Sequence, residues 1–178
     1  MQANQNWYAV AHNSVTPLTQ LSPIGFMIDI ENIGAEEQTD VNVNMSITNL
    51  AGETVFTDDL DYGNVASGSL VENMIMNNTF TPPGVADSYT ATYSVSSNET
   101  DFDVTNNDIS FRFDVSDNTF AREFNENIVG ISPADDAVIN WSYGAYYYVP
   151  NGEGFEVTDI LFNIANADQV IDLSLIHI

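Results

Sequence analysis

Apolar and polar side chains alternate along two neighbouring segments near the middle of the chain, residues 88–96 and 108–116. In both segments every second residue is apolar or aromatic, and the residues between them are Ser, Thr, Arg or Asp. A period of two places the apolar side chains on one face of an extended strand. The pattern therefore predicts two paired antiparallel strands, with an inner face made of Tyr89, Ala91, Tyr93, Val95, Ile109, Phe111, Phe113 and Val115.

Similar alternation predicts further strands earlier in the chain. They cover residues 7–12, 24–33, 41–47, 53–57 and 70–80, and Pro17 and Pro23 bracket an irregular or edge segment. About seven short strands at this spacing are typical of an immunoglobulin-like sandwich. We therefore predict an all-β chain whose residues 1–117 form an immunoglobulin/fibronectin-III-like antiparallel sandwich. Its expected buried side chains include Phe26, Ile28, Ile30, Val41, Val43, Met45, Ile47, Met74, Met76 and Phe80.

A second unit is expected from residue 118 onwards. Residues 141–149 are rich in aromatic side chains and residues 155–164 alternate again, but three or four strands cannot close a sheet core alone. Residues 118–172 are therefore interpreted as the truncated start of a second β-sandwich. The last six residues, 173–178, read LSLIHI, which matches one reading frame of the transposon end of a common sequencing adaptor. We expect these six to be an adaptor-derived artefact and the natural protein to extend beyond both ends.

The charge balance narrows the range of partners. The chain has 26 acidic and only 2 basic residues, for a net charge of -24. Nucleic-acid binding depends on Lys and Arg displacing counterions, and anionic membranes also require basic residues. We therefore expect no nucleic-acid partner and no membrane insertion; no run of apolar residues is long enough for a membrane-spanning helix. The absence of cysteine excludes disulfides, thiolate zinc sites and thiol nucleophiles.

Several short motifs resemble a known group of modules. They are Asn32-x-Gly34, FTPPG at 80–84, YTATYSVS at 89–96 and SFRFDVSDNTFAR at 110–122. Residues 7–117 resemble the bacterial adhesion-related Ig-like modules of the CARDB type, found in large secreted proteins of Bacteroidota. Residues 143–157 look like the opening of the β-sandwich that often follows such modules. The resemblance implies export, a longer chain, and an adhesion or spacer role beside other domains, so an extracellular or cell-surface location is expected although no signal peptide is visible.

One acidic connection is a candidate metal site. Asp101, Asp103, Asn106, Asn107 and Asp108 bring five oxygen-bearing side chains into the link between the two central strands. Calcium binds six to eight oxygen ligands, which Asp and Asn at alternate loop positions can supply. The pattern is not an EF-hand, and the competing interpretation is a solvated turn in which Asp and Asn bond their own backbone. Calcium is accordingly the only cofactor that the sequence predicts.

An aromatic cluster is the candidate organic-ligand site. Trp141, Tyr146 and Tyr148 could stack on the faces of sugar rings. Side chains alternate between the two faces of a strand. Among the three consecutive tyrosines at 146–148, only Tyr146 and Tyr148 would therefore share a face. Aromatic residues are also ordinary core material, and burial or an interface is the competing interpretation.

No catalytic arrangement is visible, so we expect no enzyme. His12 has no serine or carboxylate nearby that marks a triad, and no pair of carboxylates can be assigned to a cleft. The sequence favours a non-catalytic extracellular adhesion or spacer module of a multidomain secreted or cell-surface protein. Its expected partners are neighbouring domains of the same polypeptide and a protein or polysaccharide surface ligand. The alternative is a carbohydrate-binding accessory region of a secreted hydrolase.

Overall fold

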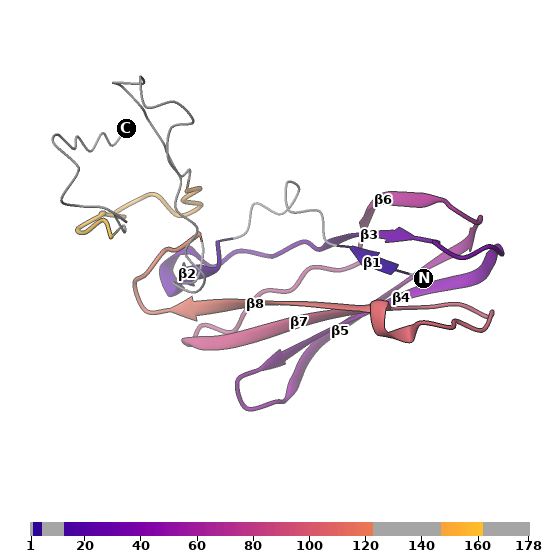
Figure 1. Ribbon diagram of the computed structural model, residues 1–178. Coiled ribbons are helices and arrows are strands. Elements are labelled where there is room, and N and C mark those ends of the chain that lie inside the picture. Colours follow the sequence, from indigo (N-terminus) through magenta and orange to yellow (C-terminus); the bar gives the residue numbers. More distant parts are fainter. Residues whose placement is uncertain (1, 5–12, 123–146, 162–178) are drawn as a thin grey trace, which may run out of the picture.

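The computed structural model describes residues 2–4, 13–122 and 147–161. The strands of these residues all lie before residue 117 and form two β-sheets facing each other in a sandwich-like arrangement (Figure 1). These residues contain no α-helix; their only helical elements are two short 3-10 turns, η1 (Leu18–Gln20) and η2 (Val104–Asn106). No helix in this part of the chain is long and apolar enough to cross a membrane. The all-β prediction is thus confirmed for the described residues.

The larger sheet has five strands in the order β2-β8-β7-β4-β5. Their bounds are β2 (Val15–Pro17), β8 (Asp108–Ser116), β7 (Asp87–Ser96), β4 (Gln38–Asn49) and β5 (Thr54–Val65). The smaller sheet has the order β1-β3-β6, with bounds β1 (Gln2–Asn4), β3 (Met27–Glu31) and β6 (Leu70–Ile75). Tyr93 lies opposite Ile109, and Tyr89 opposite Phe113, so β7 and β8 pair as the alternation predicts.

The core lies between the two sheets, and its residues are those that the period of two selects. Ile28, Ile30, Val43, Met45 and Ile47 have no exposed surface. The other predicted inner residues are buried too, except Ile109 and Phe111, which are partly buried and pack against the cluster. Burying a large aliphatic side chain contributes about 1.5–3 kcal/mol, so this row of residues dominates the favourable free energy of folding.

The prediction of a purely antiparallel sandwich is wrong at one edge. β2 pairs in parallel with β8, with Val15 opposite Asp114 and Pro17 opposite Ser116. The larger sheet is therefore mixed. Alternation in a sequence shows which face of the sheet a side chain occupies. It does not show whether the neighbouring strand runs parallel or antiparallel. Pro17 lacks an N–H group and is tolerated here because β2 is an edge strand.

The strand limits also differ from the sequence-based expectation. β5 extends to Val65, well beyond the expected strand at 53–57, and includes the acidic stretch 58–64. Asp58 is buried there and accepts hydrogen bonds from the backbone N–H and side-chain Nδ2 of Asn78, at 2.8 and 2.7 Å. The expected strand at 7–12 and most of the expected second sandwich lie outside the described residues. Residues 155–161, the described part of another expected strand, form none.

Phe80, which follows β6, packs onto the larger sheet through a cluster of rings. Its backbone forms an isolated bridge with Ile24, and its ring lies 5.5 Å from that of Phe56, 5.6 Å from Tyr89 and 6.4 Å from Phe113. These centroid distances fall within the range of favourable aromatic pairs. A single side chain thus contacts rings of β5, β7 and β8.

We expect Phe80→Ala to lower the free energy of unfolding by about 3–5 kcal/mol, because it removes a buried ring and leaves a cavity. Urea unfolding of the full chain measures the change. Leu50→Ala is the matched control, because Leu50 is 79% exposed and its truncation should change stability by less than about 0.5 kcal/mol. Equal losses in the two variants would contradict the central role of Phe80.

Candidate functional site

The acidic loop, residues 97–107 between β7 and β8, is folded by its own side chains. Asp101 Oδ1 accepts a hydrogen bond from the backbone N–H of Asp103, at 2.9 Å. Asp103 Oδ1 in turn accepts from the backbone N–H of Thr105, at 3.2 Å, and so caps η2. These are the local side-chain-to-backbone bonds by which Asp stabilises turns. The loop therefore has a defined conformation.

The base of the acidic loop is fixed to the start of β4. The Glu99 carboxylate accepts hydrogen bonds from the backbone N–H of Thr39, at 2.6 Å, and from Thr39 Oγ1, at 2.7 Å. The backbone N–H of Asn98 donates to Thr39 O, at 3.0 Å. Nothing in the alternation pattern pointed to Glu99 or Thr39, because their pairing depends on which loops meet at this end of the sandwich.

The predicted calcium ligands are close in sequence, but their oxygens are directed to different partners. One oxygen each of Asp101 and Asp103 is bonded to the loop backbone, and Asp108 begins β8. The side-chain oxygens of Asn106 and Asn107 are buried without a hydrogen-bond partner. Among the described residues, no group of three or more Asp, Glu, His or Cys side chains could hold a metal ion. Calcium binding by this loop stays a prediction.

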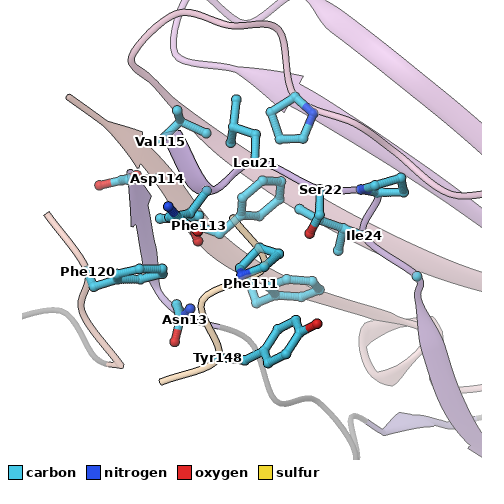
Figure 2. A pocket seen from close by; sticks show the side chains of 16 residues that line it. Asn13, Leu21, Ser22, Ile24, Phe111, Phe113, Asp114, Val115, Phe120 and Tyr148 are labelled. Carbon is cyan, nitrogen blue, oxygen red and sulfur yellow. The ribbon is translucent and has the colours of Figure 1, made fainter. Parts of the chain in front are cut away.

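A cavity of about 200 Å³ lies at the other end of β8, between its inner face and residues 20–25 (Figure 2). The rings of Phe111, Phe120 and Tyr148 line it, together with Ser22 and Ile24. Tyr148 is 68% exposed, so its ring is available to a ligand. The other two predicted sugar-stacking residues, Trp141 and Tyr146, lie outside the described residues.

A buried glutamine attaches the segment 147–155 to the sandwich beside this cavity. Gln20 Nε2 donates to Asn151 O at 3.0 Å, and Gln20 Oε1 accepts from Asn151 N–H at 2.9 Å. A third bond runs from Asn151 Nδ2 to Thr19 O, at 2.9 Å. Gln20 is only 2% exposed, so its amide and the Asn151 backbone satisfy each other away from water.

Aromatic packing adds to this attachment. The Phe120 ring lies 5.8 Å from that of Tyr147 and 5.9 Å from that of Phe155. Ala121, next to Phe120, exchanges two backbone hydrogen bonds of 3.0 Å with Val15 of β2. The contacts of Gln20, Phe120 and Ala121 together are called the joint below. Sequence reasoning missed the joint because a single glutamine between Thr19 and Leu21 carries no signal of a partner 131 positions away.

Neither a scan against models of known protein families nor a search of curated proteins found a match to this chain.

The hydrogen bonds from Thr39 predict how Glu99 makes the stability of the fold depend on pH. The backbone N–H of Thr39, and after it the hydroxyl, hold the pKa of Glu99 below its ordinary value. A carboxylate whose pKa is lower in the folded than in the unfolded state stabilises the fold at pH values above its unfolded-state pKa. This stabilisation is lost as the pH falls through the folded-state pKa. Glu99 should therefore contribute less and less to stability as the pH falls below about 4.5.

Thr39→Val removes the hydroxyl bond and keeps the backbone bond, so the pKa of Glu99 should move part of the way back up. A carbon-detected NMR titration of the Glu99 carboxyl group measures it. Thr57→Val, at an exposed position of β5, is the control and should leave this pKa unchanged. An unchanged Glu99 pKa in Thr39→Val would show that the hydroxyl does not stabilise the carboxylate.

Proposed function

We propose that this chain is a non-catalytic extracellular adhesion or spacer module of a multidomain secreted or cell-surface protein. Its two facing sheets support the assignment of residues 1–117 to the immunoglobulin/fibronectin-III-like sandwiches. The smaller sheet β1-β3-β6 faces a larger sheet in which β4, β7 and β8 are the central strands. The motifs at 80–84, 89–96 and 110–122 extend this proposal to a CARDB-type module, with neighbouring domains of the same polypeptide as its first partners.

The joint is the observation that carries the proposal. A spacer transmits orientation only if the segment that follows it is fixed to its body. Here the chain leaves β8, returns to β2 through Ala121, and is held again at Asn151 by Gln20. Losing a buried pair of hydrogen bonds costs about 1–3 kcal/mol for each group left unsatisfied, so the attachment is energetically significant.

We expect the joint to hold residues 147–157 at a fixed distance from the sandwich. Spin labels at Thr57→Cys and Glu156→Cys, both exposed positions, can report this distance by pulsed electron resonance. The chain has no cysteine of its own, so labelling is specific. The distance distribution should be narrow, and Gln20→Leu should broaden it because the Asn151 backbone groups then lack partners.

Gln38→Leu is the matched control. Gln38 is also buried, at 8% exposure, but it accepts its hydrogen bond from Ser97 at the other end of the sandwich, at 2.6 Å. Its substitution should lower stability without broadening the distribution. A broad distribution in the unaltered chain would contradict a rigid joint and with it the spacer role.

One observation favours the second candidate, a carbohydrate-binding accessory region of a secreted hydrolase. Tyr148 exposes its ring beside a cavity whose wall also carries the hydroxyl-bearing Ser22 and Thr16. Under this alternative, saturation-transfer NMR of the full chain with methyl glycosides should show transfer that Tyr148→Ala abolishes. Tyr62→Ala, at another exposed tyrosine on β5, should have no effect. Absence of transfer from the unaltered chain would reject a sugar platform at Tyr148.

A further inference from the structure

Asn151, which the joint holds to the sandwich, is followed directly by a glycine. The two residues form the only Asn-Gly pair of the chain, and every other asparagine precedes a residue that has a side chain. Asparagine is one of the chemically labile residues of proteins. Its side-chain carbon Cγ can be attacked by the backbone nitrogen of the next residue, and glycine hinders this attack least because it lacks Cβ and is conformationally free. A reactive pair of residues therefore lies within the joint.

The attacking nitrogen is available. Asn151 and Gly152 are both exposed, so water reaches them. In the part of the chain that the structure describes, the backbone N–H of Gly152 has no hydrogen-bond partner, whereas that of Asn151 is bonded to Gln20. The backbone nitrogen of Gly152 is thus not committed to another contact.

The carbon that it would attack is restrained by the joint. Asn151 Nδ2 donates to Thr19 O at 2.9 Å, while the backbone N–H and C=O of Asn151 bond the buried amide of Gln20 at 2.9 and 3.0 Å. Attack at Cγ requires the side-chain amide to turn toward the Gly152 nitrogen, and this movement breaks the bond to Thr19. A group held in this way reacts only in the fraction of molecules whose local structure has opened.

We propose that Asn151 is a site of spontaneous deamidation and that the joint controls the rate of this reaction. While the joint is closed, its three hydrogen bonds to Asn151 keep the side chain away from the Gly152 nitrogen. When the segment 147–155 detaches from the sandwich, the reaction proceeds. It consumes only water and does not depend on the spacer role proposed above.

The reaction has two steps. The backbone nitrogen of Gly152 gives its proton to solvent and forms a bond to Cγ of Asn151; the bond from Cγ to Nδ2 breaks, and the amino group takes up a proton and leaves as ammonia. Water then opens the resulting cyclic imide. Cleavage between the nitrogen and Cγ leaves an aspartate, and cleavage between the nitrogen and the backbone carbonyl carbon leaves an isoaspartate.

Either product prevents the joint from closing again in its original form. The new carboxylate is ionised near neutral pH and has no hydrogen to donate, so no bond to the carbonyl oxygen of Thr19 can form. In the isoaspartate the main chain also passes through an additional methylene group. This displaces Gly152 and, after it, the ring of Phe155 that packs on Phe120. Deamidation therefore makes an opening of the joint permanent.

Peptide mapping by mass spectrometry, after the full chain has been incubated in mildly alkaline buffer, measures the reaction. Aspartate and isoaspartate should accumulate slowly at position 151 of the unaltered chain. Gln20→Leu should raise the rate up to about tenfold, because the loss of buried hydrogen bonds increases the fraction of open molecules. Phe120→Ala, which removes the ring contacts of the joint instead, should also raise it. The unaltered chain in urea gives the limiting rate without a joint.

Two variants are the controls. Gly152→Ala should slow the reaction strongly, because its Cβ hinders the attacking nitrogen. The joint should be retained in this variant, since an added Cβ would lie 4.0 Å from the carbonyl oxygen of Val149, an ordinary contact. Gln38→Leu removes a buried glutamine at the other end of the sandwich and should leave the rate unchanged. Circular dichroism verifies that each variant is folded, and Phe120→Ala supplies the comparison if Gln20→Leu unfolds.

The spin labels at positions 57 and 156 test the effect on the joint. Incubation should broaden the distance distribution of the unaltered chain and leave that of Gly152→Ala unchanged. A fully deamidated chain with an unchanged distribution would contradict the proposed effect.

Three results of the mapping would overturn the proposed site. They are an asparagine that persists at position 151 in both the unaltered chain and Gln20→Leu, a rate in the folded unaltered chain equal to that in urea, and a Gly152→Ala variant that reacts as fast as the unaltered chain. The mass measurement does not use the labels, so it separates failure of this proposal from failure of the spacer role.

Discussion

The packing of the two sheets against each other is the interaction on which the rest of the structure depends. Each sheet buries one face only, so neither is stable without the other. Phe80 contributes to this packing, because its ring lies among those of Phe56, Tyr89 and Phe113 of the larger sheet while its backbone bridges Ile24, before β3. The acidic loop and the joint lie at the two ends of this core and take their positions from it.

Buried polar side chains then fix the irregular segments onto the sheets. Asn32, at 1% exposure, donates to the carbonyls of Glu36 and Val65 and accepts from the N–H of Gly34. Asp29 accepts from the N–H of Asn73, which has a left-handed backbone with φ of 59°. A polar group removed from water needs such partners, so each of these residues specifies one loop conformation.

The two ends of the sandwich carry different surfaces, the acidic loop at one end and a cavity lined in part by aromatic rings at the other. The acidic surface opposes random association, since like charges repel and only two basic residues offset them. The joint lies beside the cavity, because Gln20, which bonds Asn151, is one of the residues that line it.

The sequence by itself determined the all-β class, most of the core and the β7–β8 pair. The reason is that a period of two depends only on local chain geometry, and Val43, Met45, Tyr89 and Tyr93 follow it without exception. Tertiary structure alone decided the parallel placement of β2 and the buried pair of Gln20 with Asn151. These features join residues far apart in the chain, and a single sequence holds no record of which distant backbone groups will meet.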